Sequence, residues 1–149
     1  MCGIVGYLGE KDSLDIILNG LKRLEYRGYD SAGIAYYSDA GIVTKKCAGK
    51  VKQLEELLSV GSNNGRKLGI GHTRWATHGV PNRINAHPHS DSSGKFTIVH
   101  NGIIENYDTI KKHLEENSIE CKSDTDTEVL VQFINYLYDK EKLNFPDTV

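Results

Sequence analysis

Apolar residues repeat along this chain at helical spacing in four stretches. The clearest repeat follows Asp12-Ser13, a dipeptide typical of a helix cap, and is carried by Leu14, Ile17, Leu18, Leu21 and Leu24. The other three run over Val51 to Leu58, from a cap near Asn106 through Leu114, and from Val129 to Leu137. We therefore predict four amphipathic helices.

Short apolar runs between turn residues predict strands over residues 4–8, 34–37, 42–44, 68–73 and 96–99. Asp39-Ala40-Gly41 is typical of a hairpin turn, and residues 25–33 have the composition of a polar, glycine-punctuated loop. Residues 74–95 are too polar and too broken by prolines for regular structure, and loops of this length are usually functional or disordered. We expect a mixed α and β domain with antiparallel hairpins.

Length and composition narrow the class of protein. With 149 residues, 38% hydrophobic, 26% charged and a net charge of -2, the chain fits one globular domain. The basic pairs Lys45-Lys46 and Lys111-Lys112 are isolated in the sequence, so we expect no nucleic-acid partner. No apolar run approaches the roughly 18 residues of a membrane helix, and we expect no membrane association.

Three cysteines at wide spacing, Cys2, Cys47 and Cys121, are an odd set for a disulfide framework. They favour free thiols in a reducing compartment, which predicts a cytoplasmic protein.

The position of Cys2 suggests nucleophilic chemistry. If Met1 is removed, Cys2 carries both a thiol, with a reference pKa of roughly 8.5, and an α-amine, with a reference pKa of roughly 7.7–8.0. Near neutrality the amine can accept the proton that the sulfur loses, which is a recognised way to activate a nucleophile. Gly3 leaves space beside the sulfur. The competing interpretation is an ordinary residue at a frayed chain end.

Other kinds of site were weighed against this one. Gly69-Ile70-Gly71 lacks the third glycine of a dinucleotide fingerprint, and Val129 stands where a calcium loop from Asp124 needs glycine. A zinc module remains an alternative because histidines crowd one region, at His72, His78, His87, His89 and His100. A cysteine protease and a non-catalytic interaction domain also remain open. We expect no metal and no cofactor.

Six motifs together resemble the glutaminase domain of glucosamine-6-phosphate synthases, within the N-terminal-nucleophile amidotransferases. They are Cys2 to Gly6, Leu24 to Gly33, His72 to Gly79, Asn85 to His89, His100 to Tyr107 and Ser123 to Val129. The resemblance implies an α+β fold in which two antiparallel sheets lie between helical layers. The related phosphoribosyl amidotransferases, which differ at the Arg27 and Arg74 motifs, are the second candidate.

The resemblance also implies boundaries and partners. Residues 1–149 would be the N-terminal portion of the glutaminase domain, incomplete at its C-terminal side, and the sugar-isomerising domain would be absent. Glutamine would be the substrate. Fructose 6-phosphate would be a partner only through that isomerase domain, since no P-loop pattern occurs in this chain. The full-length protein would be a homo-oligomer.

The resemblance assigns a role to individual residues. Cys2 would attack the glutamine amide, and the Asn101 side-chain NH2 and the Gly102 backbone N–H would stabilise the oxyanion. The fork of Arg74 would bind the α-carboxylate and Asp126 the α-ammonium, charges that match a free amino acid and argue against a protease. Trp75, Thr77 and His78 would complete the pocket, with Trp75 in a loop that closes over glutamine. Supporting roles would fall to Arg27, Gly28 and His87.

Overall fold

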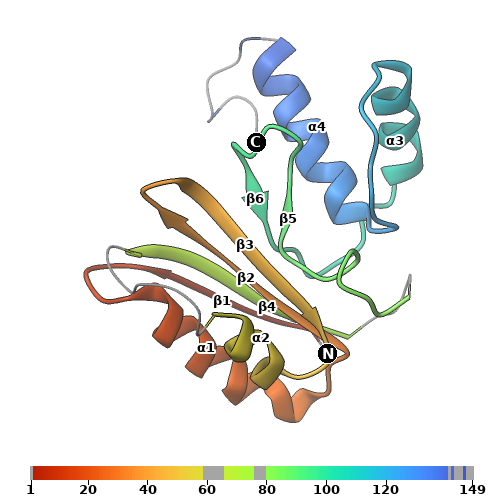
Figure 1. Cartoon of the computed structure of the whole chain (residues 1–149). Coiled ribbons are helices and arrows are strands. Elements are labelled where there is room, and N and C mark those ends of the chain that lie inside the picture. The colour runs from red at the N-terminus through yellow and green to blue at the C-terminus, as the bar shows by residue number, and fades with distance from the viewer. Residues whose placement is uncertain (1, 59–65, 76–79, 141, 143–145, 147–149) are drawn as a thin grey trace.

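The structure is a computed structural model that describes residues 2–58, 66–75, 80–140, 142 and 146. Its elements, in chain order, are β1 Gly3–Leu8, α1 Ser13–Leu24, the 3-10 helix η1 Glu25–Arg27, β2 Ser31–Ser38, β3 Gly41–Ala48, α2 Val51–Leu58, β4 Leu68–Arg74, β5 His89–Ser90, β6 Thr97–Ile98, α3 Tyr107–Glu116 and α4 Asp126–Lys140 (Figure 1).

Four antiparallel strands form the main sheet, in the order β1-β4-β2-β3. Strand β4 lies in the middle, so that Thr73 pairs with Gly3 on one side and with Ala32 on the other. This register brings the start of β1, the start of β2 and the end of β4 to the same end of the sheet. The predicted candidate residues Cys2 and Arg74 therefore lie at the same end of the molecule.

Helices α1 and α2 cover one face of the main sheet (Figure 1). The side chain of Asp12 accepts a hydrogen bond from the Leu14 backbone N–H at 2.9 Å, which confirms the predicted cap of α1. The core between helices and sheet is fully apolar at its centre, with Ile17, Leu21, Ile34, Val51 and Leu54 all fully buried. Since a Cβ at Gly71 would lie 2.4 Å from Ile17, the glycine lets α1 approach β4 closely.

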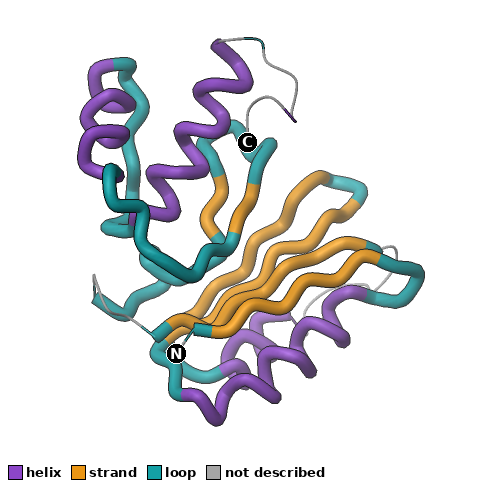
Figure 2. Tube along the Cα trace, turned by 180° about the vertical axis from the view of Figure 1, so that it is seen from behind, coloured by secondary structure: helices purple, strands orange, loops and turns teal. Residues whose placement is uncertain are grey.

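The opposite face of the main sheet meets a second layer that contains the short strands β5 and β6, and helices α4 and α3 lie beyond it (Figure 2). The hydroxyls of Thr44 in β3 and Ser90 in β5 lie 3.3 Å apart and join the two sheets. The molecule thus has four layers in the order α1 and α2, the main sheet, the second sheet, and α4 with α3. This confirms the predicted α+β arrangement of two antiparallel sheets between helical layers.

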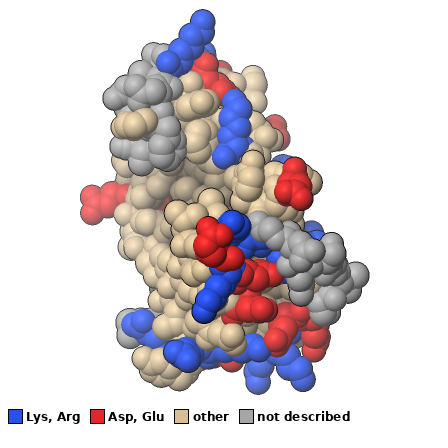
Figure 3. Space-filling model, turned by 90° about the vertical axis from the view of Figure 1, so that its left-hand side faces the viewer, with Lys and Arg blue, Asp and Glu red and all other residues tan. Residues whose placement is uncertain are grey.

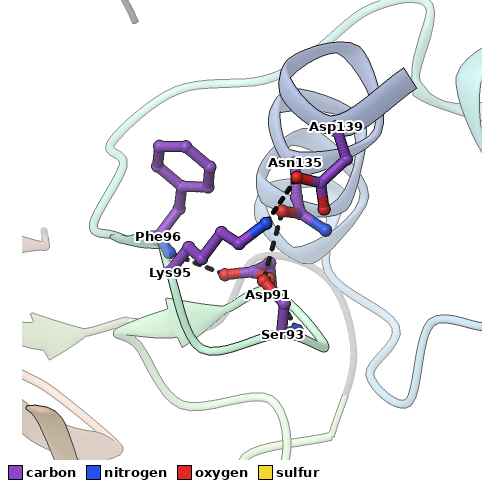
Figure 4. Close-up of polar contacts among 6 residues, drawn as sticks. All are labelled: Asp91, Ser93, Lys95, Phe96, Asn135 and Asp139. Carbon is purple, nitrogen blue, oxygen red and sulfur yellow. Dashed lines mark hydrogen bonds and ion pairs between the residues drawn. The ribbon is translucent and has the colours of Figure 1, made fainter. Parts of the chain in front are cut away.

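The hairpin after β5 is tied to α4 by a polar network (Figure 4). Buried Asp91 accepts hydrogen bonds from the Ser93 N–H at 2.6 Å and the Phe96 N–H at 2.7 Å, and also from the Ser93 hydroxyl. That hydroxyl also lies 3.2 Å from the side-chain oxygen of Asn135, and Lys95 forms an ion pair with Asp139. These contacts therefore fix the position of the hairpin against α4.

The structure corrects several predicted boundaries. Strand β2 begins at Ser31, inside the stretch predicted as a loop, because Ser31 pairs with both Ala48 and Arg74. Strand β3 continues to Ala48, beyond the predicted end at Thr44, and α4 begins at Asp126 rather than Val129. The long predicted loop contains β5, and most of the loop predicted between α2 and β4 lies outside the described residues.

Among the described residues, no helix is both long enough and apolar enough to cross a membrane. On the face shown in Figure 3, acidic and basic side chains are interspersed rather than gathered by sign. That distribution fits the small net charge of -2.

Candidate active site

A cavity of about 170 Å³ lies at the end of the main sheet where β1 begins and β4 ends, and residues around the starts of α3 and α4 also line it. Most of the predicted site residues that the structure describes line it, namely Cys2, Arg74, Trp75, His87, Asn101, Gly102 and Asp126. Thr77 and His78 lie outside the described residues. Residues from five separate sequence motifs thus share one small cavity.

The Cys2 sulfur is held by the backbone of the residue after β4. The Trp75 N–H donates to Sγ at 3.2 Å, and the thiol lies 3.6 Å from the Trp75 carbonyl oxygen. Pairing of β1 with β4 creates this contact, since Gly3 lies opposite Thr73. The thiol is half-buried and free, at the edge of the cavity.

Asn101 lies beside Cys2 with its two amide ends in different surroundings. Its NH2 group lies 3.5 Å from the Cys2 carbonyl oxygen, and its side-chain oxygen lies 2.8 Å from Nε2 of His72. The next residue, Gly102, has φ +153, and a Cβ there would lie 2.9 Å from the His100 ring. Asn101 and Gly102 thus line the same cavity as the thiol, with the Asn101 NH2 group on the side of Cys2.

Three charged side chains line the same cavity, namely Arg74, Asp124 and Asp126. Arg74, the last residue of β4, is 6% exposed, and Asp126 is the first residue of α4. One carboxylate oxygen of Asp126 accepts a hydrogen bond from the Ile104 N–H at 2.8 Å, which ties α4 to the segment that carries Asn101. The loop before α4 is fixed by Asn85, which exchanges two hydrogen bonds with Asp124, at 3.0 and 3.1 Å.

Three buried histidines form a continuous group behind the cavity. The ring of His87 stacks on His72 with centroids 4.3 Å apart and contacts His89 edge-on at 4.8 Å. Burial lowers the pKa of His72 to about 4, of His87 to about 2 and of His89 to about 3, so all three rings are neutral near pH 7. No group of three or more His, Cys, Asp or Glu among the described residues is placed to hold a metal ion.

The predicted supporting residues differ in position. The backbone at Gly28 has φ +80, and a Cβ there would lie 2.6 Å from the Trp75 ring. The missing side chain of this glycine therefore leaves room for the indole. Arg27 lies in η1 and is not part of the cavity wall. His87 lines the cavity, and a Cβ at Gly33 would lie 2.1 Å from its carbonyl oxygen. Glycine at position 33 therefore permits the close approach of the His87 backbone to β2.

Seven cavity residues lie in the singled-out motifs but had no predicted role: His72, His100, Ile103, Tyr107, Asp124, Thr125 and Thr127. A signal for His72 was available, because residues two apart on a strand face the same side of a sheet. His72 and Arg74 share such a face of β4, while Gly69 and Gly71 face α1. Alternation in the predicted strand would have placed His72 beside the site.

Comparison with known proteins gives a consistent result. The model of the glutamine amidotransferase domain family matches residues 59–141, more than half of the chain. Glutamine--fructose-6-phosphate aminotransferases are similar over 134 residues and 90% of the chain, with 54% identity for Bacillus thuringiensis subsp. konkukian (strain 97-27) and 56% for Bacillus subtilis (strain 168). The chain spans about a fifth, 22%, of the length of these relatives.

Solved structures agree on the fold. A structure of glutamine phosphoribosylpyrophosphate amidotransferase from B. subtilis, complexed with ADP and GMP, has a TM-score of 0.78 and 26% identity over 99% of this chain and 31% of its own. A structure of the allosteric regulatory enzyme of purine biosynthesis has a TM-score of 0.81, with the same identity and coverage. By sequence and by fold, the chain belongs to the glutamine amidotransferase domain family.

Proposed function

We propose that this chain hydrolyses the side-chain amide of free glutamine to glutamate and ammonia through a thioester on Cys2. The observation that carries this proposal is that a thiol, the Asn101 side-chain amide, the Gly102 backbone and charged side chains of both signs line one cavity. These are the groups that an amide bond and an amino-acid backbone require from an acyl-transfer site.

The chemical steps follow from the position of Cys2. With Met1 removed, the α-amine takes the thiol proton, and the sulfur attacks the amide carbon to form a tetrahedral oxyanion. The protonated amine then gives its proton to the departing nitrogen, which leaves as ammonia. Water attacks the resulting thioester, its proton returns to the sulfur, and glutamate is released with the thiol restored.

Asn101 and Gly102 would stabilise the negative oxygen in both tetrahedral intermediates. The Asn101 NH2 lies on the Cys2 side of its amide, 3.5 Å from the Cys2 carbonyl oxygen, which supports an oxyanion position next to the sulfur. The Gly102 N–H is the second donor. Loss of one donor of this kind typically lowers the rate about 100- to 1000-fold.

Substrate choice would rest on charge and on size. Arg74 supplies a planar fork for the α-carboxylate, and Asp126 supplies a carboxylate for the α-ammonium. A cavity of about 170 Å³ suits a single amino acid, since sites for drug-sized ligands usually exceed about 300 Å³. Both features favour free glutamine over a peptide.

In the longer protein, the ammonia would be used to convert fructose 6-phosphate into glucosamine 6-phosphate in the cytoplasm. The name of the relatives that are 54–56% identical supports this use, whereas the phosphoribosylpyrophosphate amidotransferase structures are only 26% identical. Three free cysteines support a reducing compartment. Transfer of ammonia to phosphoribosylpyrophosphate is the second candidate.

Glutamate release from glutamine tests the proposed hydrolysis. We expect release by the wild-type chain and none above background for Cys2→Ala. Cys121→Ala is the matched control, because burial raises the pKa of Cys121 to about 11 and leaves that thiol protonated at neutral pH. Equal activity of the wild type and Cys2→Ala would reject the thioester. Release of glucosamine 6-phosphate by this chain alone, from glutamine and fructose 6-phosphate, would show that a second active site lies within it.

A further inference from the structure

His72 is buried behind the cavity and touches Asn101. It is 1% exposed, its Nε2 lies 2.8 Å from the Asn101 side-chain oxygen, and its ring is clamped against His87. The pairing of His72 with Ile4 in β1 and with Gly33 in β2 fixes its backbone in the middle of the sheet. The ring therefore has one orientation relative to Asn101.

We propose that His72 is a positioning residue that donates its Nε2 proton to the Asn101 oxygen and so keeps the Asn101 NH2 turned toward Cys2. This inference rests on the proposed hydrolysis, in which Asn101 stabilises the oxyanion. Without a donor behind it, the Asn101 amide can rotate by half a turn. Its carbonyl oxygen would then face both the Cys2 carbonyl and the developing oxyanion, where it repels charge instead of stabilising it.

The surroundings of the ring support the proton assignment. Burial lowers the pKa of His72 to about 4, so the imidazole carries a single proton near pH 7. Nε2 faces the side-chain carbonyl oxygen of Asn101 at hydrogen-bond distance, 2.8 Å. A single proton on Nε2 satisfies that contact, because an amide oxygen can only accept.

His87 and His89 connect the His72 ring to the loop that precedes α4. The stacked ring of His87 blocks tilting of His72, and His89 Nε2 lies 3.0 Å from the Thr125 hydroxyl, one residue before α4 begins. Because all three rings are neutral, none places a full positive charge beside the others. The histidine group thus holds Asn101 through packing and one directed hydrogen bond.

Two substitutions separate the directed hydrogen bond from simple packing. His72→Gln can place an amide NH2 near the position of Nε2, while His72→Asn is one methylene shorter and cannot reach Asn101. We expect kcat for glutamine hydrolysis to fall on the order of 10- to 100-fold in His72→Asn, with KM within about 2-fold of wild type because Asn101 acts on the oxyanion. His72→Gln should recover most of that loss.

A double-mutant cycle and the ring tautomer complete the test. In an Asn101→Ala background, His72→Asn should cause little further loss, since the two residues act as a unit. Nitrogen NMR of ring-labelled wild-type protein should show the proton of His72 on Nε2. Absence of glutamate release by the wild type would reject the hydrolysis itself. A proton on Nδ1, equal losses in His72→Gln and His72→Asn, or additive losses in the cycle would overturn the positioning role.

Discussion

The backbone N–H of Trp75 donates a hydrogen bond to the Cys2 sulfur at 3.2 Å, although the two residues are 73 positions apart in the chain. The contact exists because β1 pairs with β4 in a register that sets Gly3 opposite Thr73. The same tryptophan has its ring against Gly28 and is 51% exposed at the cavity rim. The position of the Cys2 thiol therefore depends on the position of Trp75, the residue that follows Arg74.

Gly28→Ala should disturb this segment. A Cβ would lie 2.6 Å from the Trp75 ring, so the indole must move, and we expect kcat/KM for glutamine to fall on the order of 10- to 100-fold. Gly94→Ala is the control, because Gly94 also has positive φ, +73, but its Cβ would meet nothing within 4 Å. It shares the backbone strain and should keep full activity. Equal activity of the two variants would show that the Trp75 ring is not held by Gly28.

Arg74→Lys should raise KM for glutamine at least about 10-fold even though it keeps the positive charge, because lysine cannot make two parallel hydrogen bonds to a carboxylate. Asp126→Asn should raise KM as well, through loss of the charge opposite the α-ammonium. Arg66→Lys provides the control, since Arg66 is also buried but pairs with Asp12 at 2.7 Å. Steady-state kinetics at varied glutamine measures all three. Unchanged KM in Arg74→Lys and Asp126→Asn would mean that the substrate is assigned wrongly.

The free energy of unfolding should depend on pH through the buried histidines. In the folded state burial lowers the pKa of His72 to about 4 and of His87 and His89 to about 2 and 3, while an unfolded histidine titrates near ~6.5. Below pH ~6.5 the unfolded chain binds protons that the folded chain does not, so stability falls as the pH drops from ~6.5 toward ~4. Above that window these groups contribute no pH dependence.

Urea unfolding between pH 5 and pH 7 measures this slope, which is at most about 1.4 kcal/mol per pH unit for each histidine. His87→Gln should reduce the slope, whatever it does to the overall stability. His113→Gln, which replaces an exposed histidine of α3 outside this group, is the matched control. A slope that is the same in His87→Gln and wild type would show that His87 is protonated in the folded protein.

Asp91→Ala should destabilise the hairpin on α4 (Figure 4). The substitution removes the acceptor of the Ser93 and Phe96 backbone N–H groups, and leaving buried donors unpaired costs about 1–3 kcal/mol. Asp139→Ala removes only an exposed ion pair with Lys95 and should unfold like the wild type. Thermal unfolding compares the two. Equal stability of Asp91→Ala and the wild type would contradict the network.

Helices were the part of the fold most open to prediction from sequence, because their apolar positions repeat and Asp12 marks a start. Strand boundaries were harder to predict from the sequence. Ser31 and Ala32 look like loop residues, yet they pair with β3 and β4 on both sides, and that pairing is a long-range contact. Short strands such as His89–Ser90 exist only through their partners and carry no local pattern.

The candidate site divides in the same way. Cys2 was singled out by its position in the chain, and Asn101 and Arg74 by the resemblance of their motifs to the glutaminase family. The contact between His72 and Asn101 joins positions 29 residues apart, and that between Asn85 and Asp124 joins positions 39 apart. Such contacts depend on tertiary packing, so the contacts themselves became visible only in the structure.

A comparison of two forms of the same chain tests the central claim most directly. A tag that is cleaved immediately before Cys2 yields, from one preparation, a form with a blocked Cys2 nitrogen and a form with a free α-amine. General-base assistance is typically worth about 100- to 10000-fold. We predict that glutamate release will rise as the tagged mass is replaced by the lower mass of the cleaved chain, with activity only in the fraction that begins at Cys2. Equal specific activity before and after cleavage would contradict the mechanism.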